Sequence, residues 1–181
     1  YPTRTIKFVV PFPSGSGTDQ AAREAANDIT RRTGQPVIVE NKPGANGLIA
    51  AQQVARAAPD GYTVFITSMT TQSVNPFLYK KLPYDPVADF IPVAMISKTA
   101  MVLVVRNTKD QPKSVAELTA RMQAAGSKLS FASGNTSSLV AGKTYSNAVS
   151  SPALHVPYKG NPQAVTDLMA GAVDFMFSDL T

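Results

Sequence analysis

Short apolar runs alternate along this chain with segments in which apolar residues recur every three or four positions. In the first half, the apolar runs lie at residues 6–10, 36–40 and 62–67, and the helix-spaced segments at 18–33, 48–55 and 71–81. A short apolar run predicts a strand, and the longer spacing predicts an amphipathic helix. Strands and helices in regular alternation predict βαβ units, in which a parallel sheet carries helices on both faces.

The second half repeats this order after a proline-rich stretch over residues 82–92. Two β-rich runs follow at 93–96 and 101–105, and the second is expected to cross into another domain. Further strands are predicted at 129–132, 153–156 and 173–177, and further helices after Ser114, after the loop 133–138 and at 161–170. The sequence therefore predicts an α/β protein with a first lobe over residues 1–98 and a second over 99–181.

Polar loops follow five of the predicted strands. They lie at residues 13–19, 68–71, 133–138, 158–160 and 178–179. Ligands of open α/β sheets bind outside the carboxyl ends of the strands, so these loops are the candidate binding segments. If two such domains face each other, the loops line one cleft, which is the layout of a hinged binding protein.

The first of these loops has the composition of an anion site. Gly15, Ser16 and Gly17 let backbone N–H groups turn toward one point, and the next helix adds its unpaired first-turn donors and the positive end of its dipole. Phosphate and carboxylate both fit such a site. The alternative is a tight strand-to-helix turn in which Thr18 or Asp19 is the helix N-cap.

Composition limits the remaining chemistry. The 181 residues are 44% hydrophobic and 16% charged, as in a globular protein, and the net charge of +5 favours anionic partners. Lysine and arginine residues are scattered without interleaved aromatic residues, so no nucleic-acid partner is predicted. The chain has no cysteine and one histidine, so no metal site is predicted.

No cofactor and no catalytic activity are predicted. Gly15-Ser16-Gly17 is followed by Gln20 in place of the third glycine of a dinucleotide-binding loop, and Gly142-Lys143-Thr144 lacks the first glycine of a phosphate-binding loop. The only histidine, His155, lies in the predicted strand 153–156, where a hydrogen-bonded structural role is expected. A nucleophile elbow is also missing from the sequence.

Five short motifs occur in the order of one receptor family. They are Val10 to Asp19 (VPFPSGSGTD), Glu40 to Ala45 (ENKPGA), Ala58 to Thr63 (APDGYT), Lys81 to Asp85 (KLPYD) and His155 to Gly160 (HVPYKG). On these motifs the chain resembles the Bug family, the periplasmic solute receptors of tripartite tricarboxylate transporters. The motifs cover essentially the whole chain, so the resemblance is far more specific than any single loop.

The resemblance implies a two-lobed periplasmic-binding-protein fold, a "Venus flytrap" with mainly parallel sheets flanked by helices. It implies that a small organic acid binds in the interdomain cleft, partly through water, and is delivered to the membrane permease subunits of the transporter. The implied localisation is the periplasm, after removal of a signal peptide. A ligand-sensing module of the same fold that feeds a signalling partner is an alternative, and an enzyme that uses the same cleft is another.

The resemblance also implies where the acid binds. Its carboxylate is expected between the loop that begins at Phe12 and the loop 133–138, with further contacts from the other strand-end loops. Lys159 either pairs with the acid or is a solvated lysine in a turn. The predicted ligand-binding residues are Phe12, Pro13, Ser14, Gly15, Ser16, Gly17, Thr18, Asp19, Ser68, Thr70, Ser133, Gly134, Asn135, Thr136, Ser137, Ser138, Tyr158, Lys159 and Asp179.

The chain departs from the family pattern in three ways. Ser14 and Ser16 stand where proline and glycine are more usual, and they add two hydroxyls that could reach the ligand or stiffen the loop. Leu139 stands where the family often has histidine, so no histidine contact is expected. Family members continue for roughly another hundred residues beyond Asp179, so this chain is C-terminally truncated relative to them. Apolar surface and a sheet edge are therefore expected to be exposed, and self-association is expected to cover them.

Overall fold

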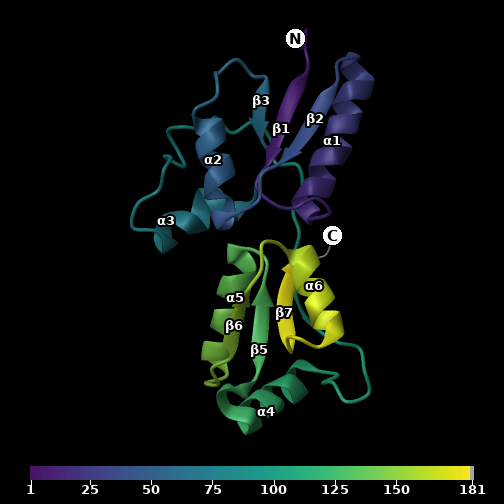
Figure 1. The fold of residues 1–181 in the computed structure, drawn as a ribbon, viewed down its shortest axis with the longest axis vertical. Helices are drawn as coiled ribbons and strands as arrows, with labels where there is room; N and C mark the ends of the chain where they lie inside the picture. The colour runs from purple at the N-terminus through teal and green to yellow at the C-terminus, as the bar shows by residue number, and fades with distance from the viewer. Residues whose placement is uncertain (180–181) are drawn as a thin grey trace. The chain divides into compact units, whose positions relative to one another are not determined.

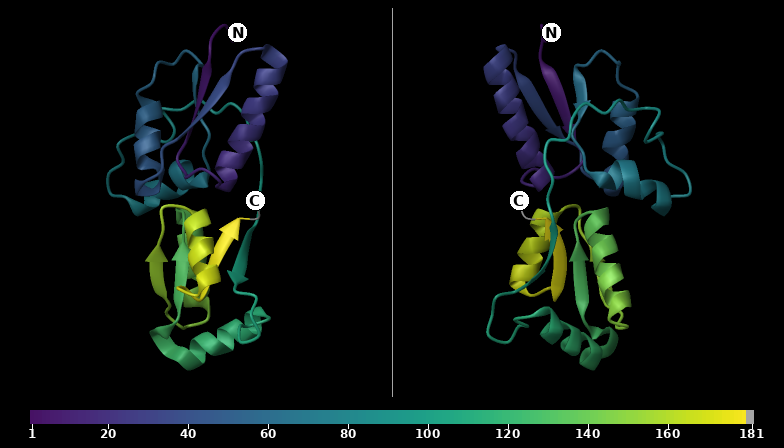
Figure 2. Two further views of the ribbon diagram at one scale, coloured as in Figure 1. Left: turned by 45° about the vertical axis from the view of Figure 1, so that its right-hand side comes forward. Right: turned by 180° about the vertical axis from the view of Figure 1, so that it is seen from behind.

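The computed structural model describes residues 1–179, which form two compact units, Tyr1–Thr99 and a second unit that begins at Ala100. Figures 1 and 2 show unit 1 from purple to teal and unit 2 from teal to yellow. Each unit is built on one sheet. No helix within the described residues is long and apolar enough to cross a membrane.

Unit 1 contains a three-stranded parallel sheet in the order β2-β1-β3. Its strands are β1 (Ile6–Val10), β2 (Val37–Asn41) and β3 (Thr63–Phe65). Its helices are α1 (Gly17–Thr33), α2 (Leu48–Ala55) and the short α3 (Asn75–Leu78), with a 3-10 turn η1 (Ala45–Gly47) before α2 and a π-helical turn η2 (Thr70–Val74) before α3.

The side chains of β1 alternate between two faces of the sheet, and all of them except the exposed Lys7 are buried. One face packs against α1 through Ile6, Phe8, Val10, Ala22 and Ala26. Val9 points to the other face, where α2 contacts β1 and β3, and it is fully buried. A strand that is buried on both faces is expected to be a nearly continuous apolar run, which explains the composition of residues 6–10.

Unit 2 contains a four-stranded sheet in the order β4-β7-β5-β6. Its strands are β4 (Met101–Val105), β5 (Ser130–Ser133), β6 (Leu154–Pro157) and β7 (Phe175–Asp179). Its helices are α4 (Val115–Ala125), α5 (Thr136–Ala148) and α6 (Asn161–Ala170), with a 3-10 turn η3 (Gly126–Lys128) after α4. β5 pairs in parallel with β6 and β7, whereas β4 pairs antiparallel with β7.

Both faces of this second sheet are also covered. Phe131 and Phe175 stack with their ring centroids 5.7 Å apart and pack against α4 and α5. Ala132 and Met176, their neighbours along the two strands, point to the opposite face and pack against α6. The layers predicted from the alternation of strands and helices are therefore present in each unit.

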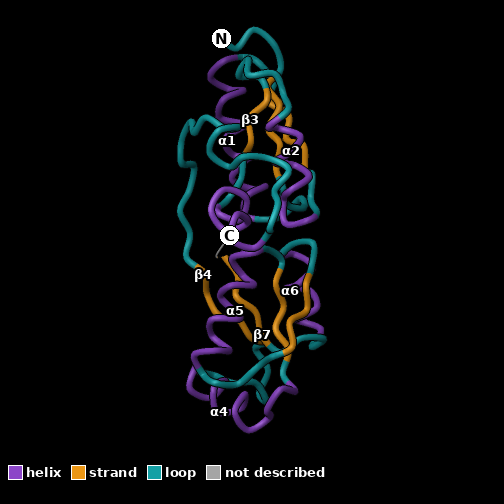
Figure 3. The backbone as a smooth tube through the Cα atoms, turned by 90° about the vertical axis from the view of Figure 1, so that its left-hand side faces the viewer, coloured by secondary structure: helices purple, strands orange, loops and turns teal. Residues whose placement is uncertain are grey.

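Residues 93–96 do not form the predicted strand. The whole stretch between α3 and β4 is loop (Figure 3), and no strand of the described residues pairs with this run. Ile91, Val93 and Met95 are each more than four fifths exposed, at 87%, 86% and 81%. An apolar run becomes a strand only where a neighbour pairs with its backbone, so composition alone gave the wrong prediction here.

The helix predicted over 71–81 is shorter than expected. It ends at Leu78 because Tyr79 has an extended backbone, with φ −114° and ψ 128°. The Tyr79 hydroxyl accepts a hydrogen bond from the Asn46 side chain at 2.7 Å.

Candidate functional site

Ser16 sets the start of α1. Its hydroxyl oxygen accepts a hydrogen bond from the Asp19 N–H at 3.3 Å, and its backbone is extended, so Ser16 is the N-cap. The predicted alternative of Thr18 or Asp19 as the N-cap is wrong, because both residues lie within the first turn. The hydroxyl of Ser16 is thus used by the helix itself.

The Asp19 carboxylate is bound from four directions. Oδ2 accepts hydrogen bonds from the Gly15 N–H (2.9 Å), from Arg23 Nε (2.9 Å) and from the Ser14 hydroxyl (3.4 Å). Oδ1 accepts one from Asn41 Nδ2 at 2.8 Å. The residue is 1% exposed. Asp19 therefore stabilises the conformation of the loop, and it holds Gly15 in its left-handed conformation with φ 81°.

Two opposing effects act on the pKa of Asp19. Burial raises the pKa, but the hydrogen bonds from Arg23, Gly15 and Asn41 and the charge of Arg23 outweigh burial, so the pKa lies below its usual value. The carboxylate is thus ionised at neutral pH, and its charge is compensated by Arg23 within the loop.

The first turn of α1 keeps free donors. Gly17 and Thr18 occupy positions whose N–H groups have no acceptor inside a helix, and neither donates to another described residue. Both residues are half-buried and therefore partly accessible. Because the dipole of a 17-residue helix adds positive potential at this end, the two N–H groups can bind a carboxylate oxygen.

The residues predicted after β3 differ in accessibility. Ser68 is half-buried, and its hydroxyl oxygen accepts a hydrogen bond from the Thr70 N–H at 3.3 Å. Thr70 is fully buried, and its hydroxyl has no hydrogen-bond partner among residues 1–179. Only Ser68 of this pair is placed where a solute can reach its side chain.

In unit 2, the loop after β5 is fixed by its own side chains. Asn135 is the N-cap of α5, and its Oδ1 accepts a hydrogen bond from the Ser138 N–H at 2.8 Å. The Ser138 hydroxyl donates to the Phe177 carbonyl oxygen of β7. Ser137 is half-buried, and its hydroxyl makes no hydrogen bond to another described residue, so it is the accessible donor of this loop.

The predicted loop 178–179 is the end of β7, so Asp179 supplies a carboxylate from the strand itself, whereas Lys159 supplies a cation from the loop after β6. Lys159 is exposed. Asp179 accepts a hydrogen bond on Oδ1 from Asn161 Nδ2 at 2.6 Å. The Tyr158 hydroxyl donates a hydrogen bond to Asp167 Oδ2 of the same unit at 2.8 Å. Burial, together with this neighbour, raises the pKa of Tyr158.

His155 has the structural role that the sequence predicts. Its Nε2 lies 2.7 Å from the Ser133 hydroxyl oxygen, and its ring lies 5.0 Å from the ring of Phe131, measured between centroids. Burial, followed by the positive charge of Lys143, lowers the pKa of His155. The neutral imidazole is therefore the form that fits the folded chain.

We expect the chain to lose stability as the pH falls from 7 toward 5, and His155→Gln to lose less. The ordinary pKa of 6.5 returns on unfolding, so between this value and the lower folded pKa the unfolded chain binds more protons. Stability from this residue is complete above 6.5 and declines as the pH falls toward the folded pKa. Glutamine keeps a hydrogen-bonding group for Ser133 but does not titrate in this range. Melting temperatures from pH 5 to 8 test this prediction, and equal pH slopes in both proteins contradict it.

The structure brings the predicted residues together within each unit. Those of unit 1 follow β1 and β3, and those of unit 2 are the last residues of β5 and β7 or follow β5 and β6, at the carboxyl ends of parallel strands. Several are too buried for their side chains to contact a solute in this state, namely Phe12, Ser16, Asp19, Thr70, Ser133, Thr136 and Ser138. Phe12 in particular belongs to the core of unit 1.

Sequence reasoning missed the residues that hold these loops in shape. Asn41 and Arg23 bind Asp19 in unit 1, and Asn161 binds Asp179 in unit 2. Asn41 ends a strand, so the strand-end rule, applied to β2 as well, could have found it. Arg23 stands four residues after Asp19, so the i, i+4 rule for ion pairs on a helix could have found it, whereas no sequence signal pointed to Asn161.

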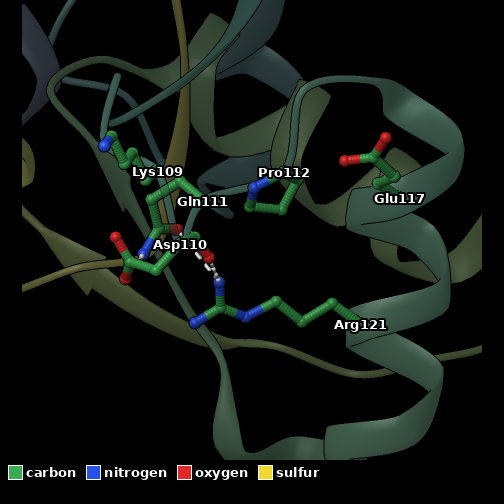
Figure 4. Close-up of a pocket in the computed structure, with 6 residues that line it drawn as sticks. All are labelled: Lys109, Asp110, Gln111, Pro112, Glu117 and Arg121. Atoms are coloured by element: carbon green, nitrogen blue, oxygen red, sulfur yellow. Dashed lines mark hydrogen bonds between the residues drawn. The ribbon is translucent and has the colours of Figure 1, made fainter.

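A separate pocket of about 290 Å³ lies beside α4 (Figure 4). It is lined by Lys109, Asp110, Gln111, Pro112, Glu117 and Arg121, none of which is a predicted ligand-binding residue. Arg121 Nη1 donates to the Asp110 carbonyl oxygen (3.2 Å) and to Gln111 Oε1 (3.1 Å). Two cations and two carboxylates line the pocket, so it does not favour an anion as the loop of α1 does.

Within the described part of the chain, no group of three or more histidine, cysteine, aspartate or glutamate side chains could hold a metal ion. The polar groups at the strand ends are neutral donors, individually bound carboxylates and the exposed cation Lys159. Their chemistry is suited to hydrogen bonding of an anion.

The chain is similar to proteins of one receptor family. A family model described as a tripartite tricarboxylate transporter family receptor (TctC) matches residues 21–181. Protein BugT of Bordetella pertussis is 35% identical over 177 residues, which are 96% of this chain and 54% of BugT. The chain spans about half the length of the curated relatives that it matches.

Two solved structures are similar to this chain in both fold and sequence. R. palustris Rpa4515 with adipate has a TM-score of 0.96 and 31% identity, covering 99% of this chain and 60% of that one. MatC from Rhodopseudomonas palustris with bound malate has a TM-score of 0.90 and 32% identity, covering 99% and 61%. The periplasmic-binding-protein fold predicted from the sequence is confirmed.

Proposed function

The chain belongs to the tripartite tricarboxylate transporter receptor family, and from this premise we propose that it binds a small organic acid as an extracytoplasmic solute receptor. The acid is a carboxylate held by the donors of the loop 12–19 and of the loop 133–138. The receptor works in the periplasm and delivers the acid to a permease of the tripartite tricarboxylate type.

One observation carries the proposal: the free N–H groups of Gly17 and Thr18 at the start of α1. They are backbone donors at the positive end of a helix, beside a loop whose own carboxylate is already fully occupied. Neutral donors that converge can hold a carboxylate without a dedicated arginine. The related structures with adipate and malate support a carboxylate as the ligand.

A receptor without catalysis is the function that this arrangement supports best. The Ser133–His155 pair has no described carboxylate bound to its imidazole, and Ser133 is 5% exposed, so the pair is placed for structure and not for attack on a substrate. Self-association stays a prediction, as does the division into lobes at residue 98.

We expect adipate or malate to raise the melting temperature of the purified chain. At a concentration of about one hundred times Kd, binding to the native state alone adds about 2.7 kcal/mol, or about 5–10 °C for a chain of this size. The matched control is adipamide, the neutral diamide of adipate. A panel of other carboxylic acids tested in the same assay identifies the acid, and calorimetry gives its affinity.

Two outcomes count against the proposal. If adipamide raises the melting temperature as much as adipate, the site does not recognise carboxylate. If no acid in the panel changes the melting temperature or gives heat in calorimetry, this chain does not bind organic acids.

A further inference from the structure

Asn41 joins three segments of unit 1 through one side chain. It is the last residue of β2, and its Nδ2 donates to the Phe12 carbonyl oxygen (3.0 Å) and to Asp19 Oδ1 (2.8 Å). Its Oδ1 accepts a hydrogen bond from Arg23 Nη2 at 3.2 Å. The end of β2 is thereby tied to the loop after β1 and to the first and second turns of α1.

Only a primary amide can make this set of bonds. Two acceptors, the Phe12 carbonyl and the Asp19 carboxylate, require two donated hydrogens, and the Arg23 guanidinium requires an acceptor. An aspartate of the same shape would put a second carboxylate against Asp19. A serine would be too short to reach all three partners.

The bonds of Asn41 fix the shape of the loop from both ends. Phe12 is anchored by its buried side chain, and Asp19 in turn holds the Gly15 N–H. The segment between them therefore has a fixed start and a fixed end, with Gly15 in a left-handed conformation. This shape places the first turn of α1 at the end of the loop with the Gly17 N–H free.

We propose that Asn41 is a positioning residue of the carboxylate site. It does not touch the acid; through Phe12 and Asp19 it holds the loop 12–19 in the one conformation that offers the first-turn donors of α1 to a carboxylate. We call the three hydrogen bonds of Asn41, to Phe12, Asp19 and Arg23, the clamp. The role of Asn41 in binding rests on the proposed function, whereas the clamp is a property of the ligand-free chain.

The test compares Asn41→Ala and Asn41→Asp with Glu40→Gln. Glu40 is the neighbouring residue of β2, and its carboxylate pairs with Lys7 and Lys42 instead of the loop, so its variant is a matched control. Hydrogen exchange of the Gly15 amide in the ligand-free chain measures the clamp, and calorimetry with adipate measures binding.

We expect exchange of the Gly15 amide to become about tenfold faster in both Asn41 variants, since the loss of one well-placed hydrogen bond corresponds to about that factor. Adipate binding weakens by about tenfold or more in both, and Glu40→Gln changes neither quantity. If adipate binding weakens in Asn41→Asp but not in Asn41→Ala, the added charge is the cause and the positioning role is overturned. Unchanged exchange of the Gly15 amide in the Asn41 variants also overturns it.

Arg23→Met keeps the test decisive if the Asn41 variants do not fold. Arg23 is half exposed, so Arg23→Met removes the outer contact of the same clamp and leaves the core unchanged. Faster Gly15 exchange with a few-fold weaker binding supports the proposal, and wild-type values of both overturn it. If the wild-type chain binds no acid, the proposed function fails, while the Gly15 exchange still decides whether Asn41 clamps the loop.

Discussion

Replacing Asp19 by alanine is expected to abolish measurable acid binding and to lower the free energy of unfolding by about 2–4 kcal/mol. The variant removes a carboxylate that is 1% exposed and that accepts hydrogen bonds from the Gly15 N–H and from Asn41 Nδ2. It also leaves Arg23 without its ion-pair partner at 2.9 Å. The loop then loses the conformation that places the donors of α1, so stability and binding fall together.

Asp28→Ala is the matched control for this variant. Asp28 lies on the same helix and pairs with Arg31 and Arg32, but its side chain is 38% exposed and it holds no loop. Exposed ion pairs contribute little to stability because water and salt screen them, so this variant should unfold nearly as the wild type and bind adipate equally well. Urea denaturation and calorimetry compare the two. Adipate affinity that is retained in Asp19→Ala shows that Asp19 is not needed for the site.

The layers of the fold could be predicted because the chain buries both faces of each sheet. Runs such as residues 6–10 are apolar except at the exposed Lys7, and helix-spaced alanines such as Ala22 and Ala26 pack against them. Two helix ends could also be predicted, at Gly34 and Ser114: Gly34 takes the left-handed conformation with φ 71°, and Ser114 caps α4 by accepting the Glu117 N–H. These features depend on residues close together in sequence.

The strand predictions that were wrong or incomplete depend on pairing with residues far away in the chain. The run 93–96 and the run 101–105 have similar composition, but only the second has a partner strand, β7, which lies some seventy residues later. That pairing is antiparallel, which the βαβ rhythm did not predict. Composition gives the propensity for a strand, and the partner decides whether one forms.

In the candidate site, too, local features could be predicted from the sequence and long-range contacts could not. The loops were found by composition and by their place after strands, but the sequence did not distinguish accessible donors from internal ones. Asp19 and Thr70 were predicted to contact the ligand, and the structure buries both. Asn41 was not predicted, because its importance comes from reaching Phe12 and Asp19, which lie 29 and 22 residues away.

Gly134→Ala is expected to lower the free energy of unfolding by about 3 kcal/mol, at the upper end of the usual cost of overpacking. A β-carbon on Gly134 would lie 2.1 Å from the Asn161 nitrogen and 2.2 Å from the Gly160 carbonyl carbon. Both are backbone atoms at the start of α6, so no side-chain rotation relieves the contact. The predicted binding residue Gly134 therefore allows the loop after β5 to approach α6.

The same substitution should weaken adipate binding by about tenfold or more, because the loop moves and at least one hydrogen bond to the acid is lost. Gly126→Ala is the matched control in unit 2: Gly126 has φ 62° and no atom within 4 Å of its added β-carbon. That variant carries only the backbone strain of an alanine at φ 62° and ψ −137°, about 1–3 kcal/mol, and its adipate affinity should stay that of the wild type. Urea denaturation and calorimetry on the two alanine variants separate the clash from the general cost of replacing glycine. If Gly134→Ala is no less stable than Gly126→Ala and binds adipate as the wild type does, close approach of this loop to α6 is not what the site requires.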